Sequence, residues 1–161
     1  MKNWPVFGMY QPDTIHAITV GGGKYLVMAN EGDSKDYSNW GGFNEETRTK
    51  DITLSESASI TQWAKDMNIS SDMMKENMLG RLKITTMNGQ NSDGKYDALY
   101  TFGGRSFSIR HLETMELVYD SGDDLSRYYK DHVPNLFNSN GGVGSEQVSQ
   151  SKDTRSDDKG V

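Results

Sequence analysis

The stretch TIHAITVGGGKYLVM, residues 14–28, decides the fold class. In its first half, Ile15 and Ala17 alternate with His16 and Ile18, which is the period of a β-strand with two different faces. Its second half is rich in Tyr, Leu and Val, which favour a pleated surface. Because three consecutive glycines provide a short turn between the halves, the stretch predicts a β-hairpin.

Further short β-favouring runs follow along the chain, each bounded by Gly, Asp or Ser. They lie at residues 81–87, 98–102, 105–109 and 116–119. Short strands with frequent turns are typical of a sandwich, a barrel or a propeller. We therefore expect an all-β fold with one or two short helices.

One faint internal repeat bears on the choice among these folds. Leu26-Val27 precedes Glu31-Gly32-Asp33, and Leu117-Val118 precedes Ser121-Gly122-Asp123. The offset of about 90 residues fits two propeller blades of about 45 residues each.

Helix is expected mainly over residues 57–79. Apolar residues recur there at helical spacing: Ile60, Trp63, Ala64 and Met67. Ser57 or Ser59 is available as the N-cap, and a second short helix near residues 72–78 would end at Gly80. We interpret this region as helix packed over a sheet.

The composition excludes several classes of function. The chain of 161 residues carries a formal net charge of −6, whereas a protein that binds nucleic acid needs a basic surface. It contains no cysteine, so disulfides and thiol chemistry are excluded. No apolar run approaches the roughly 20 residues that cross a bilayer, and residues 1–5 lack the apolar core of a signal peptide.

Large apolar residues are nearly absent from residues 138–161, which predicts a polar loop or disordered tail.

Four oxygen-bearing side chains follow the predicted hairpin: Asn30, Glu31, Asp33 and Asp36. Gly32 permits a sharp turn between them. Crowded carboxylates repel one another unless solvent or a cation separates them, and hard oxygen ligands suit calcium. The loop is therefore either a calcium site, with Glu31, Asp33 and Asp36 as metal ligands, or a solvated acidic turn. The acidic loop leads into residues 34–55, which are polar. This segment is predicted to be a long irregular excursion, that is, a loop without regular structure at the edge of a sheet.

Two other oxygen-rich loops are weaker candidates for a metal site. Residues 91–97 carry an Asp-Gly turn but lack the full alternating acidic set and the distal glutamate of a calcium loop, so a hairpin turn explains them at least as well. Residues 153–160 mix carboxylates with Arg155, and ion pairs can satisfy these charges without a metal. The three histidines lie far apart in sequence and form no helical pair, which argues against zinc.

The common catalytic motifs are not visible. The chain lacks a G-x-S-x-G elbow, a Walker loop and a cysteine nucleophile. Gly103-Gly104-Arg105-Ser106 is phosphate-like only superficially, because it lies between two predicted strands and an anion cradle needs a helix N-terminus. We interpret it as a tight turn.

Several segments together resemble the choice-of-anchor I family, and they cover almost the whole chain. They are residues 3–6, 8–13, 29–33, 36–37, 48–51, 79–82, 102–108 and 120–124. The likeness is strongest to the mesenchyme-specific cell-surface glycoproteins of invertebrates, which are associated with calcified skeleton and shell. Bacterial relatives are called alkaline-phosphatase-like. The resemblance implies a secreted or surface-anchored β-propeller.

Members of this family run for several hundred residues with a secretion signal upstream. The resemblance therefore implies a fragment with two to three blades, in which residues 1–137 form a partial propeller domain and residues 138–161 end inside a family motif. Blades cut from a ring expose sheet edges. We thus expect the isolated chain to be poorly soluble or to lack a cooperative thermal transition.

By resemblance, the expected function is that of an extracellular or cell-surface, calcium-associated glycoprotein segment linked to biomineralisation. Its partner would be extracellular matrix or a mineral surface. The sequon at Asn68 would carry a glycan in a secreted protein. The enzyme alternative is a phosphatase-like or phytase-like hydrolase, in which the three carboxylates hold metal and Arg48 or Arg155 clamps phosphate. A third alternative is a purely structural propeller segment.

Overall fold

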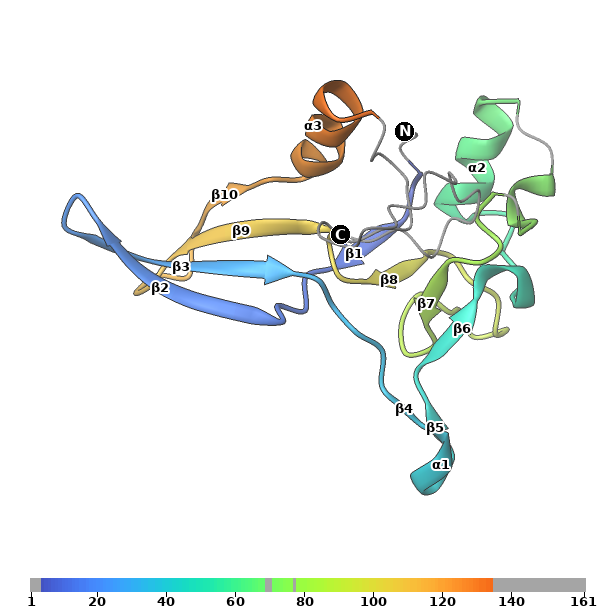
Figure 1. Ribbon diagram of the computed structural model, residues 1–161. Helices are drawn as coiled ribbons and strands as arrows, with labels where there is room; N and C mark the ends of the chain where they lie inside the picture. The colour runs from blue at the N-terminus through green and yellow to red at the C-terminus, as the bar shows by residue number, and fades with distance from the viewer. Residues whose placement is uncertain (1–3, 69–70, 77, 135–161) are drawn as a thin grey trace, which may run out of the picture. The chain divides into compact units, whose positions relative to one another are not determined.

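The computed structural model describes residues 4–68, 71–76 and 78–134. The chain divides into two compact units. Of the described residues, unit 1 takes in residues 4–8 and Ser34–Phe102, and unit 2 takes in Met9–Asp33 and residues 103–134. Each unit is built on a four-stranded sheet (Figure 1).

The sheet of unit 2 contains the hairpin predicted from residues 14–28. Its strands are β2 (Thr14–Val20) and β3 (Gly23–Asn30), which pair in antiparallel fashion. Gly21 and Gly22 in the turn have φ angles of 58° and 81°. Two successive positive φ angles are typical of the type I′ turn, whose twist matches that of the strands, so the prediction is confirmed.

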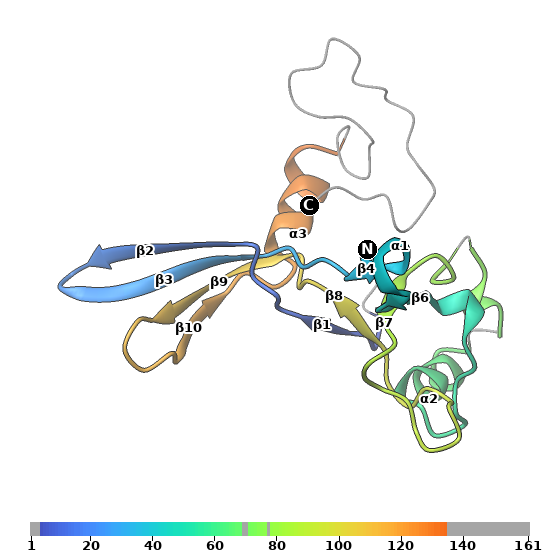
Figure 2. The same cartoon turned by 90° about the horizontal axis from the view of Figure 1, so that it is seen from below.

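A second hairpin completes this sheet. Strand β9 (Ser106–His111) pairs with both β3 and β10 (Leu117–Asp120), which gives the strand order β10-β9-β3-β2. Figure 2 shows the two hairpins from below. The predicted strands at residues 105–109 and 116–119 are confirmed, with ends that differ by one or two residues.

Helix α3 (Asp124–His132) follows β10 and corrects the prediction that helix is confined mainly to residues 57–79. The signal was available in the sequence, because Leu125, Tyr128 and Tyr129 recur at helical spacing. Arg127 also forms an ion pair at 2.9 Å with Asp123, four residues before it. None of the side chains of α3 is buried, so tertiary packing contributes little to this helix.

The sheet of unit 1 has the strand order β1-β8-β7-β6. Its strands are all three residues long: β1 Phe7–Met9, β6 Glu46–Arg48, β7 Lys83–Thr85 and β8 Tyr100–Phe102. β7 pairs antiparallel with β6 and with β8. Strands β7 and β8 confirm the runs predicted at residues 81–87 and 98–102, although each strand is shorter than its run.

Residues 34–55 are not an irregular excursion, which corrects the sequence prediction. They form β4 (Asp36–Tyr37), helix α1 (Ser38–Gly41) and β5 (Phe43–Asn44), followed by β6 and the 3-10 helix η1 (Thr49–Asp51). Because β4 pairs with β5, residues 36–44 make a small finger (Figure 1). Strands of two residues are too short to show an alternating pattern, so the sequence gives no sign of them.

Helix α2 (Ser59–Asp66) confirms the helix predicted from the spacing of Ile60 and Ala64. Its N-cap is Ala58, without a side-chain cap hydrogen bond, so the predicted serine caps are wrong. The second predicted helix is only the 3-10 turn η2 (Ser71–Met74).

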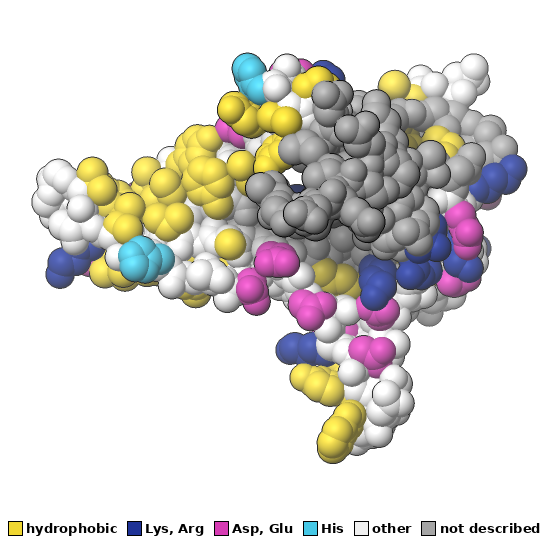
Figure 3. Space-filling view, viewed as in Figure 1, with side chains coloured by type: hydrophobic (Ala, Val, Ile, Leu, Met, Phe, Trp, Pro, Cys, Tyr) yellow, Lys and Arg dark blue, Asp and Glu magenta, His cyan; other side chains and the backbone are white. Residues whose placement is uncertain are grey.

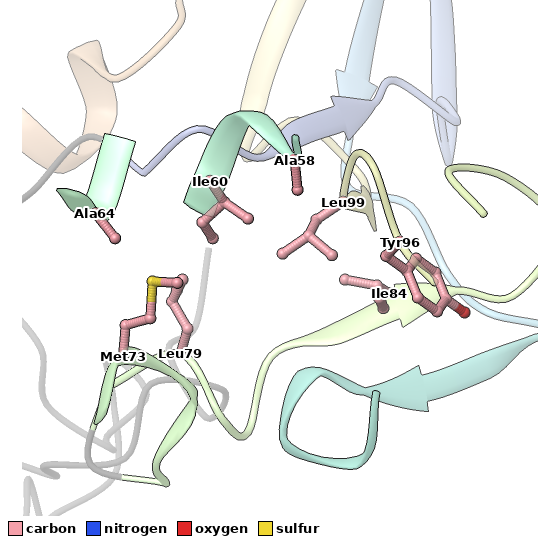
Figure 4. Close-up of a cluster of buried hydrophobic side chains, with 8 residues drawn as sticks. All are labelled: Ala58, Ile60, Ala64, Met73, Leu79, Ile84, Tyr96 and Leu99. Carbon is pink, nitrogen blue, oxygen red and sulfur yellow. The ribbon is translucent and has the colours of Figure 1, made fainter. Parts of the chain in front are cut away.

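The hydrophobic core lies in unit 1, where α2 packs on the segments around β7 and β8. Ile60, Ile84 and Leu99 are completely buried, and full burial of each such side chain contributes about 1.5–3 kcal/mol. Figure 4 shows the whole cluster: Ala58, Ile60, Ala64, Met73, Leu79, Ile84, Tyr96 and Leu99. The interpretation of this region as helix over sheet is confirmed.

Over the described residues the chain is β-rich, as predicted, with ten strands. It has three short α-helices, whereas one or two were expected. This part of the chain contains no closed barrel. The two similar segments at residues 26–33 and 117–123 do not belong to separate blades, as their offset had suggested, because β3 and β10 belong to the same sheet. The predicted tail at residues 138–161 lies outside the described residues.

Candidate functional site

Three segments that are far apart in sequence meet at one end of the unit 2 sheet. Strands β3 and β10 both run antiparallel to β9, so their C-termini lie at the same end, where β9 begins. The loops that leave this end start at Glu31 and Ser121, and the loop that enters β9 is residues 103–105. These segments are among those that carry the family resemblance.

Asn30, the last residue of β3, is completely buried at this end of the sheet. Its side-chain amide donates hydrogen bonds to the hydroxyls of Ser106 at 3.0 Å and Ser108 at 3.2 Å, and both serines are buried. Its backbone carbonyl accepts from the N–H groups of Gly104 at 2.7 Å and Arg105 at 3.2 Å. Asn30 therefore fixes the start of β9 to the end of β3, and each of these buried polar groups is satisfied.

Gly103 allows the two chain segments to approach closely. Its φ is +70°, and a Cβ atom at this position would overlap the backbone carbonyl of Glu31. Only glycine combines this backbone conformation with this lack of space. Residues 103–106 thus form the tight turn that the sequence predicts between two strands.

Asp120, the last residue of β10, ties a further segment to this end. The Tyr10 hydroxyl donates a hydrogen bond to its Oδ2, and the Gly122 N–H donates to its Oδ1 at 2.8 Å. Partial burial opposes ionisation of Asp120, but hydrogen bonds from Tyr10, Gly122 and Ser106 outweigh it and lower the pKa. The pKa of Tyr10 is raised, first by the hydrogen bond to Asp120 and then by burial. The Arg110 guanidinium lies 5.8 Å from the centre of the Tyr10 ring.

We define the sheet-end cluster by its polar residues: Tyr10, Asn30, Ser106, Ser108 and Asp120. It holds an ionised carboxylate among hydroxyl and amide groups, and it contains no imidazole or thiol that would act as base or nucleophile. Beside it, Gln11 Oε1 is buried and has no hydrogen-bond partner in the described part of the chain. The hydrogen bonds of this cluster anchor the loops at this end of the sheet.

The predicted calcium ligands lie on the loop that leaves this sheet end and on the strand that follows it. Glu31 and Asp33 are exposed residues of unit 2, whereas Asp36 is exposed in β4 of unit 1. The Asp36 carboxylate accepts hydrogen bonds from the Ser38 hydroxyl at 2.6 Å and the Ser38 N–H at 3.0 Å, and these lower its pKa. Among the described residues, no group of three His, Cys, Asp or Glu side chains is arranged to hold a metal ion.

The other predicted site residues lie apart from the cluster. In residues 91–97, the Asn91 side chain accepts from the N–H groups of Asp93 and Lys95, both at 3.0 Å, as in an ordinary turn. Arg48, a phosphate clamp in the enzyme alternative, donates to the Arg81 carbonyl at 2.7 Å. Asn68 is exposed just beyond α2. Arg155 and the loop at residues 153–160 lie outside the described residues.

The finger presents an aromatic surface that the sequence analysis does not single out. Tyr37 and Phe43 face each other across β4 and β5, with ring centroids 6.5 Å apart. Trp40 is 90% exposed. In the adjoining strands β6 and β7, Lys83 forms an ion pair with Glu46 at 2.9 Å. Three aromatic residues within seven positions, without a charge between them, are the signal that would have indicated this surface.

The chain matches the Choice-of-anchor I domain over residues 1–161 and belongs to this family. It is also similar to Gigasin-3a from Magallana gigas, with 39% identity over 99 residues. The matched stretch covers 62% of this chain and 34% of Gigasin-3a, so the match spans about a third of the length of this curated relative. No solved structure matches the chain. The family resemblance drawn from the sequence is confirmed.

Membership of this family indicates a protein of the cell surface or the extracellular space. In the described part of the chain, no helix has both the length and the apolar character needed to cross a bilayer.

Proposed function

We propose that this protein is a calcium-associated extracellular or cell-surface protein linked to biomineralised matrix. The observation that carries the proposal is that Asn30 anchors the start of the acidic loop, residues 30–36, to the buried end of a sheet. An anchored loop loses less conformational entropy on binding a cation than a free segment does. The carboxylates of this loop are therefore better suited to hold calcium than those of an unanchored acidic turn.

The proposed ligands are Glu31, Asp33 and Asp36. Both hydrogen bonds from Ser38 reach Oδ1 of Asp36, so Oδ2 is available to a cation. Calcium takes six to eight oxygen ligands and accepts backbone carbonyls and waters beside carboxylates. Three exposed carboxylates make a weak site, of the kind found in extracellular modules with Kd about 10⁻⁴ to 10⁻³ M.

The proposed partner is a matrix or a mineral surface that carries bound calcium. The sequence pI of about 5.0 makes the protein an anion at neutral pH, which favours such a surface over nucleic acid. The proposed glycan site, Asn68, is exposed beyond the end of α2 and so leaves room for a sugar.

We propose further that the two sheets are blades of a partial β-propeller with two to three blades. A propeller blade is a sheet of four strands, and each unit contains one sheet of this size. The family membership supports the same architecture.

The test of the calcium proposal is calorimetry of the full-length protein with calcium and with a chelator. A ligand that binds only the native state adds RT ln(1 + [L]/Kd), which is about 2.7 kcal/mol at a hundredfold excess over Kd. Asp33→Ala should abolish the calcium-dependent part and leave the metal-free stability unchanged or slightly higher, because it relieves carboxylate repulsion.

Asp93→Ala is the matched control, since it removes a carboxylate from the turn at residues 91–97 and should preserve the calcium response. If melting does not respond to calcium between micromolar and millimolar concentrations, the acidic loop is a solvated turn and the metal proposal is wrong.

A further inference from the structure

One face of the sheet β10-β9-β3-β2 carries no Asp, Glu, Lys or Arg. The register of the strands assigns its members, because paired residues point to the same face and successive residues alternate. We call it the uncharged face: Thr14, His16, Ile18, Val20, Gly23, Tyr25, Val27, Ala29, Phe107, Ile109, His111 and Tyr119. Such a face is unusual in a chain of which 25% of the residues are charged.

The opposite face of the same sheet has a different character. It carries the charged residues Lys24, Arg110 and Asp120, and its buried side chains include Met28 and Asn30. Part of this face is therefore already covered within unit 2, by the contacts of the sheet-end cluster.

The uncharged face is exposed at its margins, whereas Val27, Phe107 and Ile109 near its centre are half-buried. Val20 is 60% exposed and Tyr119 is 42% exposed. Rings pack laterally across the strands, with centroids 5.7 Å apart for Tyr25 and His111 and 5.6 Å apart for Phe107 and Tyr119. Figure 3 shows hydrophobic side chains gathered where β9 and β10 lie in Figure 1.

A sheet of this kind requires a second layer. Stable domains bury the apolar face of a sheet against another element, because one layer cannot remove both faces from water. In the described residues of unit 2, Met28 is the one buried apolar side chain, while the core cluster belongs to unit 1. The uncharged face is thus an apolar surface that still lacks its covering layer in the described part of unit 2.

We propose that a second copy of this chain covers the uncharged face, sheet against sheet. An isologous contact places the same patch on both partners, and a patch without charges meets its own copy without repulsion. The aligned packing of two sheets about 10 Å apart provides the geometry.

The area of the face sets the strength of this association. Strands 4.7–4.9 Å apart with a rise of about 3.4 Å per residue give a footprint of about 400 Å² for a sheet of this size. A dimer therefore buries about 800 Å² in total, counted as the footprint on both copies. The buried accessible surface is somewhat larger than this footprint. This total is less than the roughly 1,000 Å² that a stable specific interface buries, so the contact belongs with weak, transient interfaces. The dimer should therefore be weak, reversible and dependent on concentration.

The experiment is sedimentation velocity of the whole chain from about 1 to about 200 µM, a range that brackets weak dimers. The main comparison is Val20→Lys against Ile15→Lys. Both positions are on β2, both side chains are branched and exposed to similar degrees, 60% and 56%, and they lie on opposite faces. Val20→Lys should weaken the dimer at least about tenfold, because it buries a charge without a partner. Ile15→Lys should leave the dimer constant within about twofold.

A second variant, Ile18→Lys, places the charge nearer the centre of the uncharged face and should abolish the dimer. Circular dichroism of each variant verifies that the sheet is retained. Raising the salt concentration should strengthen the dimer, because salt screens the repulsion between two chains of net charge −6. A wild-type chain that stays monomeric over the whole range, or equal effects of Val20→Lys and Ile15→Lys, would overturn the proposal.

Discussion

Tyr10 and Asp120, which are 110 positions apart in sequence, are joined by a hydrogen bond from the phenol to the carboxylate. Tyr10 precedes the first strand of the unit 2 sheet, and Asp120 ends the last strand along the chain. The contact therefore joins the segment before the first strand of this sheet to the end of its last strand. Because it needs a protonated phenol and an ionised carboxylate, it also links the stability of unit 2 to pH.

The first prediction concerns Tyr10→Phe. The folded-state pKa of Asp120 is lowered, so its contribution is present above the unfolded pKa of about 3.9 and is lost as the pH falls through the folded pKa. The pKa of Tyr10 is raised, so its contribution is present below about pH 10 and is lost as the pH rises through the folded pKa. At neutral pH the substitution should cost about 1 kcal/mol, allowing for partial exposure. Urea denaturation at acid, neutral and alkaline pH measures this.

At both extremes of pH the difference between Tyr10→Phe and the wild type should shrink. Tyr119→Phe is the control, because the Tyr119 hydroxyl donates to Asp124 at 2.7 Å in an exposed contact and should matter less. A difference that stays constant from acid to alkaline pH would show that the hydrogen bond does not cause the effect.

The second prediction compares two glycines with nearly the same backbone conformation. Gly103 and Gly94 have φ angles of +70° and +73°. A Cβ at Gly94 meets nothing within 4 Å, so Gly94→Ala should cost only the left-handed strain of about 1–2 kcal/mol. Gly103→Ala adds an overlap with the Glu31 carbonyl and should cost more than about 4 kcal/mol, or prevent unit 2 from folding.

Unfolding in urea, followed by circular dichroism, measures both glycine variants. Equal costs for the two would mean that the close approach at the sheet end relaxes freely, which would contradict the role given to Gly103.

The elements predicted correctly are those with a local signal. Residues 14–28 show two β-favouring runs on either side of a glycine turn, and Ile60 and Ala64 show helical spacing, so both elements follow from short-range rules. The finger and α3 escaped prediction for the opposite reasons. The finger strands are too short to show a period, whereas α3 does show helical spacing, at Leu125, Tyr128 and Tyr129, and this signal was overlooked.

The sheet-end cluster could not be predicted from the sequence, because its residues are brought together by strands that pair over long sequence distances. Asn30 meets Ser106 and Ser108 only because β3 pairs with β9, 76 and 78 positions away. The sequence does contain two small polar residues at alternate positions of a strand, which indicates a polar face. Without the register, however, their partner cannot be chosen.

The last prediction concerns how the chain unfolds. The apolar core lies in unit 1, whereas Met28 is the one buried apolar side chain among the described residues of unit 2. The isolated chain, kept dilute, should therefore lack a single sharp thermal transition, as expected of a fragment. Hydrogen exchange followed by mass spectrometry should show faster exchange in β3 and β9 than in β7, because unit 2 opens at a lower free energy.

Leu99→Ala, which leaves a cavity in unit 1, should lower the stability of that unit by about 2–5 kcal/mol. It should speed hydrogen exchange in β7 and leave exchange in β3 and β9 unchanged. A dilute monomer that melts in one sharp transition, with all strands exchanging together, would show that the two units fold as one and would refute the interpretation of the chain as a fragment.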